Sequence, residues 1–191
     1  MASQILLLRA INVAGKNKIE MKELALLAEK AGLSHVQTYI QSGNVVGTVT
    51  RGGNVAAKLS AIIARDLRLD VRVVSIEASE LAKVLAKHPY LSVNEKKGKL
   101  ADDASKTRHV AVLDRTPTPS EIAKLDVNRS PGDAFSVSGR VIYLHFANGT
   151  GKTKFSNDYF ERVLGVTSTM RNIRTMFALV EMASERECVV P

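Results

Sequence analysis

The sequence predicts an α+β protein made by duplication, with a ferredoxin-like α/β plait in each half. Two observations lead to this fold class. Hydrophobic periodicity gives the order strand, helix, strand, strand, helix, strand, and then a further helix, in both halves of the chain. The two predicted hairpins also look alike, with SGNVV at residues 42–46 and SGRVI at residues 138–142. Because one duplication is more economical than two unrelated folds, we expect a repeat.

A change in composition separates the two halves. Residues 90–106 are rich in Lys, Asp, Ser and Gly, which is typical of a solvated linker. We therefore expect a first plait over residues 1–89, a linker over residues 90–106, and a second plait over residues 107–191 that ends in a helix and a frayed tail.

The first hairpin and helix have clear local signals. Residues 5–11 form an apolar run that is typical of a buried strand. Apolar residues spaced three and four apart then predict a helix that ends at Gly32. Residues 36–41 alternate between apolar and polar side chains, which predicts a strand with Tyr39 and Gln41 on one face, and residues 45–50 return as its partner.

The remaining elements of the first half are predicted from helix-capping residues and from a proline that ends a helix. Asn54 can cap a second helix, which leads to a β-branched strand at residues 71–76. Ser79 opens a further helix, and Pro89 ends it because a proline disfavours helix in the residue before it.

The second half repeats this order. Residues 109–113 are a strand, and Thr118 with Glu121 three residues later predicts a capped helix. Two strands at residues 134–137 and 141–146 form the hairpin. Ser156 caps the next helix, residues 166–168 are a short last strand, and Thr169 is expected to open the final helix.

Composition limits the classes of protein. The chain is 45% hydrophobic, and its apolar runs are far shorter than the roughly 20 residues of a membrane helix. It shows no secretory signal and has one cysteine, Cys188, so we expect a cytoplasmic protein. The net charge is +8, with most of the excess in residues 51–100, and this raises the odds of a polyanionic partner.

Polar and basic side chains gather at the predicted ends of several elements. Arginine forks, lysines and amides at such ends suit a phosphate or carboxylate. Tyr39 could also stack on a base. The alternative is that these side chains have structural roles. Arg9 would then pair with an acidic side chain, the asparagines would hydrogen-bond to the backbone of their own turns, and the lysines would keep an exposed loop soluble. The candidate ligand-binding residues are Arg9, Asn12, Lys16, Tyr39, Gln41, Ser42, Asn44, Lys152, Lys154, Arg171 and Asn172.

The loop at residues 148–153 resembles the end of a phosphate-binding P-loop in Gly151, Lys152 and Thr153. That motif needs a glycine five residues before Gly151, where Phe146 stands, so we reject nucleotide hydrolysis. Two glycines, the lysines and the start of the following helix could still hold an anion.

No catalytic or metal-binding pattern stands out, and no cofactor is expected. The four histidines, at positions 35, 88, 109 and 145, lack the spacing of a metal pair. Asp102 and Asp103 are adjacent in the predicted linker, and Cys188 lies in the tail, so neither an acid–base pair nor a thiol nucleophile is indicated.

The chain resembles the bacterial family known as domain of unknown function 1697. The resemblance rests on LLRAINVAGKNKIEMKEL at residues 7–24, TYIQSGNVV at 38–46, GTGKTKFSND at 149–158 and TSTMRNIRT at 167–175. It implies two ferredoxin-like plaits and supplies no activity.

The chain departs from the family pattern at Ala10 and Ala14, where the family tends to glycine. It also departs at Gly47, where phenylalanine is usual, and at Ile173, where tryptophan is usual. A ligand that approached the backbone near Ala10, or stacked on that tryptophan, would bind less well here.

The reading that these patterns favour is a protein that binds an anionic ligand, either a phosphorylated small molecule or a nucleic acid. One alternative is an enzyme acting on a small phosphorylated substrate, with Tyr39 or Lys16 as its acid. Another is an interaction protein that dimerises through its sheet edges.

Overall fold

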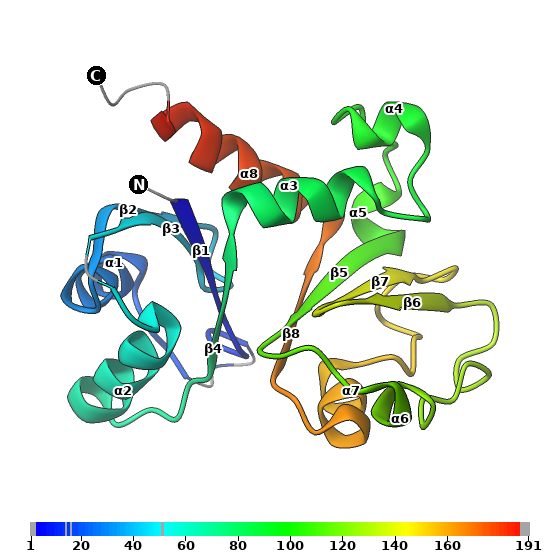
Figure 1. The fold of residues 1–191 in the computed structure, drawn as a ribbon, viewed down its shortest axis with the longest axis horizontal. Coiled ribbons are helices and arrows are strands. Elements are labelled where there is room, and N and C mark those ends of the chain that lie inside the picture. The colour runs from blue at the N-terminus through cyan, green and yellow to red at the C-terminus, as the bar shows by residue number, and fades with distance from the viewer. Residues whose placement is uncertain (1–2, 14, 16, 51, 188–191) are drawn as a thin grey trace. The chain divides into compact units, whose positions relative to one another are not determined.

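The structure is a computed structural model that describes residues 3–13, 15, 17–50 and 52–187 (Figure 1). The chain divides into two compact units. Unit 1 comprises Met1–Leu81 and Leu179–Pro191, and unit 2 comprises Ala82–Ala178. Within the described residues, no helix is both long and apolar enough to cross a membrane.

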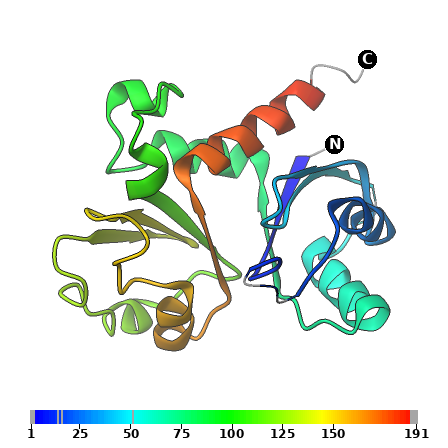
Figure 2. The same cartoon turned by 180° about the vertical axis from the view of Figure 1, so that it is seen from behind.

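Unit 1 contains a four-stranded antiparallel sheet with the order β2-β3-β1-β4. Helices α1 (Met21–Lys30) and α2 (Val55–Leu67) lie together on one side of it (Figures 1 and 2). Leu24 and Ile63 from these helices pack in one buried core with Leu6 from the sheet. The strands are β1 (Ser3–Leu8), β2 (Leu33–Tyr39), β3 (Asn44–Val49) and β4 (Val73–Glu77).

Unit 2 contains a second four-stranded antiparallel sheet with the order β6-β7-β5-β8. Helix α7 (Asn157–Leu164) and the short helix α6 (Pro119–Ile122) cover one face. Their core is aromatic, with Phe135 at 5.0 Å from the ring of Phe155. The strands are β5 (Arg108–Leu113), β6 (Ala134–Ser138), β7 (Val141–His145) and β8 (Ser168–Asn172).

The central strands β1 and β5 are buried on both faces. Leu6 and Leu8 point into the core shared with α1 and α2, whereas Ile5 and Leu7 project from the opposite face and are also 0% exposed. In β5, Val110 and Val112 are likewise fully buried opposite the aromatic core. The continuous apolar run of β1 therefore correctly indicated a buried strand, and the structure shows that both of its faces are buried.

The two sheets carry the same hydrogen bonds at the ends of their central strands. The amide of Leu8 donates to Gly43 O at 2.8 Å, and that of Leu113 donates to Arg140 O at 2.9 Å. The amide that follows each strand donates to a carbonyl just before the neighbouring edge strand. Arg9 N donates to Arg72 O, before β4, at 2.9 Å, and Asp114 N donates to Thr167 O, before β8, at 3.0 Å.

These bonds correct the predicted alignment of the two hairpins. They match Gly43 with Arg140, whereas the likeness of SGNVV to SGRVI matches Gly43 with Gly139. The reason is turn length. Tyr39 pairs with Asn44 across four residues, but Ser138 pairs with Val141 across two. A shift of one residue moves side chains to the opposite face of a strand, so the sequence likeness is out of register.

The last helix begins later than predicted. Residues 168–172 form β8, and α8 (Ile173–Glu187) follows it directly, so the prediction that Thr169 opens the helix was wrong. Thr169 instead pairs with Val112 of β5. Non-local strand pairing overrode a local cap signal. Helix α3 (Ala78–Ala86) follows β4 in the same way, with no residue between them.

The segment predicted as a linker contains two short helices, α4 (Val93–Lys96) and α5 (Ala104–Thr107). Ser92 and Glu95 form a complete capping box at the start of α4. Within this segment Ala104 is fully buried. The domain boundaries at residues 89 and 107 stay a prediction.

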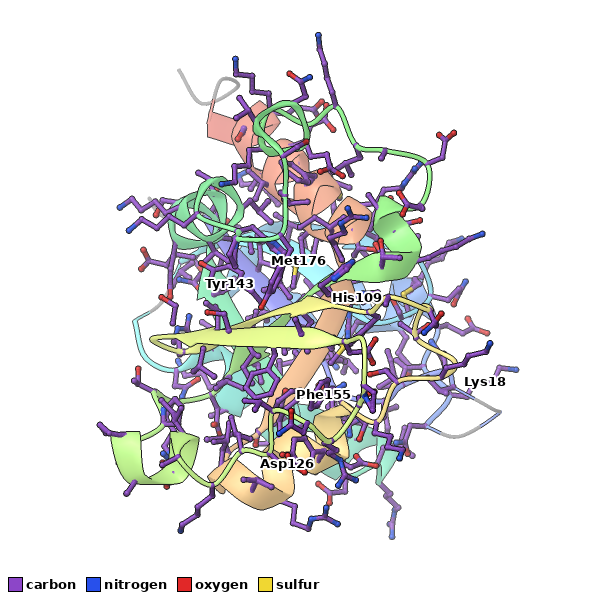
Figure 3. All side chains as sticks on the ribbon, turned by 90° about the vertical axis from the view of Figure 1, so that its right-hand side faces the viewer. Lys18, His109, Asp126, Tyr143, Phe155 and Met176 are labelled. Atoms are coloured by element: carbon purple, nitrogen blue, oxygen red, sulfur yellow. The ribbon has the colours of Figure 1, made fainter. Side chains whose placement is uncertain are left out.

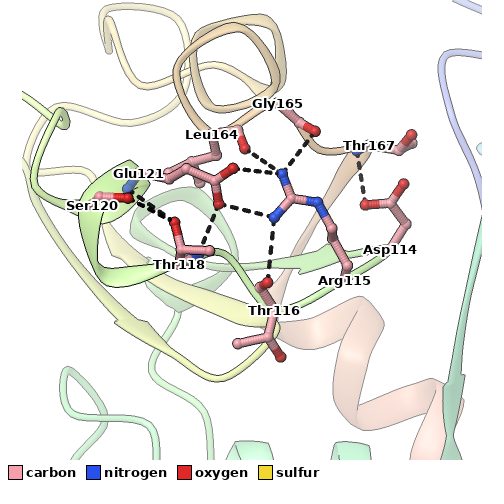
Figure 4. Close-up of polar contacts among 9 residues, drawn as sticks. All are labelled: Asp114, Arg115, Thr116, Thr118, Ser120, Glu121, Leu164, Gly165 and Thr167. Carbon is pink, nitrogen blue, oxygen red and sulfur yellow. Dashed lines mark hydrogen bonds and ion pairs between the residues drawn. The ribbon is translucent and has the colours of Figure 1, made fainter.

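A polar network holds the end of β5 against α7 (Figure 4). Arg115 binds both carboxylate oxygens of Glu121, at 2.8 and 2.9 Å, and donates to Leu164 O and Gly165 O at the end of α7. A cation at a helix carboxyl end is favourable because it satisfies the last carbonyls. The hydrogen bonds from Arg115 and Thr118 lower the pKa of Glu121 to about 2.

The tight site at Gly43 gives a stability prediction. A Cβ at Gly43 would lie 2.7 to 2.8 Å from atoms of Ile11 and Leu8, and the backbone is left-handed with φ +75°. Gly43→Ala should therefore lower the free energy of unfolding by about 2 to 4 kcal/mol, measured by urea denaturation.

Gly15→Ala is the matched control. Its φ is +76°, but no described atom lies within 4 Å of the added Cβ. It should cost about 1 kcal/mol from backbone strain alone. Equal losses for the two variants would show that the contact with Ile11 and Leu8 has no energetic weight.

Candidate functional site

In unit 1, the predicted site residue Asn12 holds two loops together. Its Nδ2 donates to Ile19 O and to Gln41 O, both at 2.9 Å, and its Oδ1 accepts from the Ile19 amide at 2.9 Å. These contacts join the loop before α1 to the turn between β2 and β3. Asn12 thus takes the scaffold role of a turn asparagine.

The turn after β2 has its own internal lock at Asn44, which is fully buried. Its Nδ2 donates to Tyr39 O and to Ser42 Oγ, both at 3.0 Å. The strand predicted to reach Gln41 ends at Tyr39, because Ile40 is left-handed with φ +48°. The alternation that would place Tyr39 and Gln41 on one face therefore stops at Ile40.

These two loops concentrate backbone strain. Ala10, Asn12, Asn17 and Ile40 all have a left-handed backbone, with φ between 48° and 54°. A β-branched residue such as Ile40 is rare in this region. Ala10 has the conformation that glycine adopts without strain, which explains why glycine suits this position. Such strain is found more often at functional sites.

The other candidates of unit 1 lie around these loops. The Arg9 side chain is half-buried, Gln41 is exposed, and the ring of Tyr39 is half-buried. Lys16 lies outside the described residues. The structure therefore brings Asn12 and Gln41 together through a hydrogen bond from the Asn12 side chain to Gln41 O. The side-chain amide of Asn44 likewise binds the Tyr39 carbonyl and the Ser42 hydroxyl group.

In unit 2, two loops are joined around the predicted site residue Lys154. Its amide donates to Ser130 Oγ at 3.1 Å, and its carbonyl accepts from Arg129 Nε at 3.1 Å. Asp133 completes the connection, because it accepts from Ser130 Oγ at 2.6 Å and from the Ala147 amide at 2.9 Å. The loop before β6 and the loop after β7 are therefore one hydrogen-bonded assembly.

Arg129 is fixed in this assembly from two directions. Its guanidinium carbon lies 4.4 Å from the ring centre of Tyr159, and its Nε is engaged by Lys154 O. Tyr159 in turn accepts from the Asp126 amide at 2.8 Å through its hydroxyl group. The arginine plane is thus preorganised by a cation–π contact. Arg129 was not among the residues that the sequence singled out.

Lys152 and Lys154 are both exposed on the second of these loops. The Lys152 amide donates to Gly149 O at 3.4 Å, and Thr153 Oγ1 accepts from the Phe155 amide at 3.1 Å. Arg129 lies on the first of the two joined loops, and Lys152 and Lys154 lie on the second. We call these three residues the basic loop pair. Because the loop amides of Lys152 and Lys154 bind within the protein, the side chains are the groups left for an anion.

Arg171 and Asn172 lie in β8 and not in the first turn of a helix. Arg171 pairs with Val110, and its Nη1 donates to Thr169 Oγ1 and to Met170 O, both at 2.9 Å. Asn172 Oδ1 accepts from the Thr175 amide at 2.8 Å and so supports the first turn of α8.

A second polar cluster of unit 2 lies between α3 and the sheet, around His88. The ring is fully buried, with Nδ1 accepting from the Tyr90 amide at 3.2 Å. The proton therefore sits on Nε2, which lies 3.3 Å from His109 O. The ring of Tyr143 stands edge-on at 5.0 Å. Figure 3 labels His109 and Tyr143 on the sheet.

Both histidines of this cluster are kept neutral by burial. Desolvation lowers the pKa of His88 to about 4, with smaller contributions from Lys96 and Arg108. Desolvation also lowers the pKa of His109 to about 4, and His88 adds to the shift. Among the described residues, no atom hydrogen-bonds to the buried Nδ1 of His109.

Sequence reasoning missed the features that join residues far apart in the chain. Nothing local links Arg129 to Tyr159, or His88 to His109. The capping box at Ser92 and Glu95 did have a sequence signal, a serine followed by a glutamate three residues later. In the part of the chain that the structure describes, no three His, Cys, Asp or Glu side chains gather as metal ligands.

The fold and this distribution of side chains define an α+β protein with two four-stranded antiparallel sheets. The chain belongs to the family of proteins of unknown function DUF1697, whose model matches residues 1–143. The match runs from the first residue, through the sheet of unit 1, and ends within β7. Four candidate residues lie beyond it: Lys152, Lys154, Arg171 and Asn172.

Among solved structures, the chain is similar over nearly its whole length to a bacterial protein. It is the conserved bacterial protein SP0830 from Streptococcus pneumoniae, with 21% sequence identity and a TM-score of 0.63. The similarity covers 96% of this chain and 99% of that one, and at this identity it shows the fold alone. No curated protein matches the chain in sequence.

The buried histidines predict how stability depends on pH. Both have a lower pKa when folded, about 4, than the 6.5 of an unfolded histidine. Above pH 6.5 both states are neutral and no stability is lost. As the pH falls from 6.5 to 4, the unfolded chain binds protons that the folded protein does not, which costs up to about 3 kcal/mol per histidine.

Urea denaturation at several pH values between about 7 and 4.5 checks this prediction. His109→Gln removes one titrating group and should flatten the fall in stability, whatever its effect at neutral pH. His35→Gln, which makes the same substitution at an exposed position, is the control variant. A pH dependence of His109→Gln that matches the wild type would contradict the proposed role of burial.

Proposed function

We propose that this protein binds a phosphate-bearing anion at the basic loop pair of unit 2. The observation that carries the proposal is the hydrogen-bonded assembly of two loops, which holds Arg129 beside the backbone of Lys154. Lys152 lies two residues away on the same loop and is exposed. Three cationic side chains are therefore presented by loops that are already ordered.

The chemistry of these side chains suits phosphate. A guanidinium presents donors in a planar fork that matches two phosphate oxygens, and a lysine adds a mobile point charge. Arg129 is held at Nε and stacked on Tyr159, so its orientation is fixed before a ligand arrives. Ordered binding groups lose less conformational entropy on association, which favours affinity.

The acidic groups nearby support this arrangement because they are engaged. The two oxygens of Asp133 accept from Ser130 and Ala147. Asp126 Oδ1 accepts from the Asn128 amide at 2.9 Å. These carboxylates stabilise the loops and reduce the local positive charge, so we expect modest affinity that depends strongly on salt.

The other candidate residues, in unit 1 and in β8 of unit 2, have a smaller part in this proposal. Asn12 and Asn44 use their side-chain amides to hold loops together. Roles of Arg9, Lys16, Tyr39, Gln41, Ser42, Arg171 and Asn172 in ligand binding stay predictions.

The finer features of the fold support a repeated scaffold for this site. We infer that each half is a ferredoxin-like α/β plait and that the chain arose by duplication. The strand orders β2-β3-β1-β4 and β6-β7-β5-β8 correspond, and so do the hydrogen bonds at the ends of β1 and β5. We also propose a cytoplasmic location, in line with a single cysteine in 191 residues.

The salt dependence of binding tests the anion site. Fluorescence anisotropy with a short labelled single-stranded oligonucleotide should show binding that weakens about twentyfold between about 50 and about 200 mM salt, as expected for three cationic contacts. ATP and inorganic phosphate, added as competitors, separate a preference for nucleic acid from a preference for a small phosphorylated molecule.

A double variant with a matched control makes the test specific. Lys152→Ala with Lys154→Ala should weaken binding several-fold and reduce the salt slope by about 0.7 per lysine. Lys83→Ala with Lys87→Ala removes the same charge from exposed positions on and just after α3 and should preserve most of the binding. If both double variants lost the same amount of binding affinity, the loss would come from the lower net charge alone, and a site at the basic loop pair would be refuted.

A further inference from the structure

Strand β6 is one of the two outer strands of the unit 2 sheet, and its outer edge carries no charge, proline or bulge. It pairs with β7 from Ala134 to Ser138 without a shift in register. Its sequence, AFSVS, contains no charge and no proline. Proteins usually guard an edge strand with charges, proline or a bulge, because an open edge binds further strands.

The corresponding strand of unit 1 does have such protection. β2 is the outer strand of its sheet, and its pairing with β3 shifts register between Ser34 and Gln37. His35, within this irregularity, has a left-handed backbone with φ +51°. A bulge of this kind twists the edge away from a partner. The two outer edges therefore differ, although the strand order is the same.

The turn after β6 decides which backbone groups face outward. Ser138 and Val141 close a two-residue turn with Gly139 at φ +57°, so they form a hydrogen-bonded pair. Hydrogen-bonded and non-hydrogen-bonded pairs alternate along an antiparallel ladder. The N–H and C=O groups of Val137 and Phe135 consequently point away from β7, toward the open edge.

We propose that β6 pairs with β6 of a second copy of this chain, antiparallel and about a two-fold axis at Ser136. In this register Phe135 lies opposite Val137 of the partner, so the outward N–H and C=O groups of both strands are matched. Ser136 lies opposite the partner's Ser136. The unit 2 sheets of the two copies then form one continuous sheet, and the outer edges of both β6 strands are paired.

Side chains also fit this pairing. Phe135 and Val137 are partly buried and pack against the aromatic core of unit 2, so they project from the same face. A phenylalanine opposite a β-branched residue is a favourable cross-strand pair. Asp133 and Arg140, which flank β6, are bound within unit 2 and take no part in this pairing. Asp133 accepts from Ser130 and Ala147, and Arg140 donates to Leu113 O.

The symmetry argues for a second copy over an unrelated peptide. A two-fold interface requires one patch to be complementary to itself. β6 meets this requirement in its register of hydrogen-bonding groups and in its apolar residues, because Phe135 and Val137 exchange places across the two-fold axis. This inference does not depend on the proposed anion site.

Sedimentation velocity over a range of concentrations tests the proposal. The wild-type chain should form a dimer. Ser136→Lys places like charges opposite each other and should raise the dimer dissociation constant about tenfold, and Ser136→Glu should do the same. An equal mixture of the two variants should dimerise again, because the opposed charges then attract. Loss of folding in either variant could not produce this recovery.

Gln37→Lys adds the same charge to the outer strand of unit 1, at an exposed position, and should leave the dimer intact. Hydrogen exchange gives a second measurement: the amides of Phe135 and Val137 should become protected as concentration rises. A wild-type chain that stays monomeric at every concentration overturns the proposal. A dimer that is unaffected by both Ser136 variants also overturns it.

Discussion

The burial of the two central strands on both faces is the constraint on which the rest of this structure depends. A strand with no solvated face must find a partner for every backbone N–H and C=O group within the protein. At the ends of β1 and β5, turns and neighbouring segments supply these partners: Gly43 O and Arg72 O in one sheet, and Arg140 O and Thr167 O in the other. The turns must therefore lie close to the strand ends, which explains why Gly43 has no room for a side chain.

This constraint also explains what the polar side chains near the strand ends do. Asn12 and Asn44 hold turns in place, and Arg115 joins the end of β5 to the last carbonyls of α7. Residues that look like a ligand site in the sequence can thus be the means by which a buried sheet closes its ends. The basic loop pair differs, because its loops are stabilised by Ser130, Asp133 and backbone groups, and the side chains of Lys152 and Lys154 are exposed.

Local signals predicted the elements well where the physics is local. Asn54 caps α2 through its side chain, and Thr118 with Glu121 forms the expected capping box of α6, because each cap involves groups three residues apart. Prediction failed where the deciding partner is distant. Thr169 resembles a helix cap but lies in β8, and the likeness of the two SGN and SGR turns hid a difference in turn length. Of the three residues of the basic loop pair, the sequence singled out Lys152 and Lys154 but not Arg129, and their role in binding stays a prediction.

The sequence by itself determined the order of strands and helices, the burial of β1 and the membership of a family whose activity is not known, because periodicity, caps and motifs are properties of neighbouring residues. The tertiary structure alone decided the register of the second hairpin, the start of α8 and the place of Arg129 over Tyr159. It also decided that His88 and His109 are buried and therefore neutral. Each of these depends on which distant segments meet in the folded chain, and the free energy of those contacts outweighs local preference.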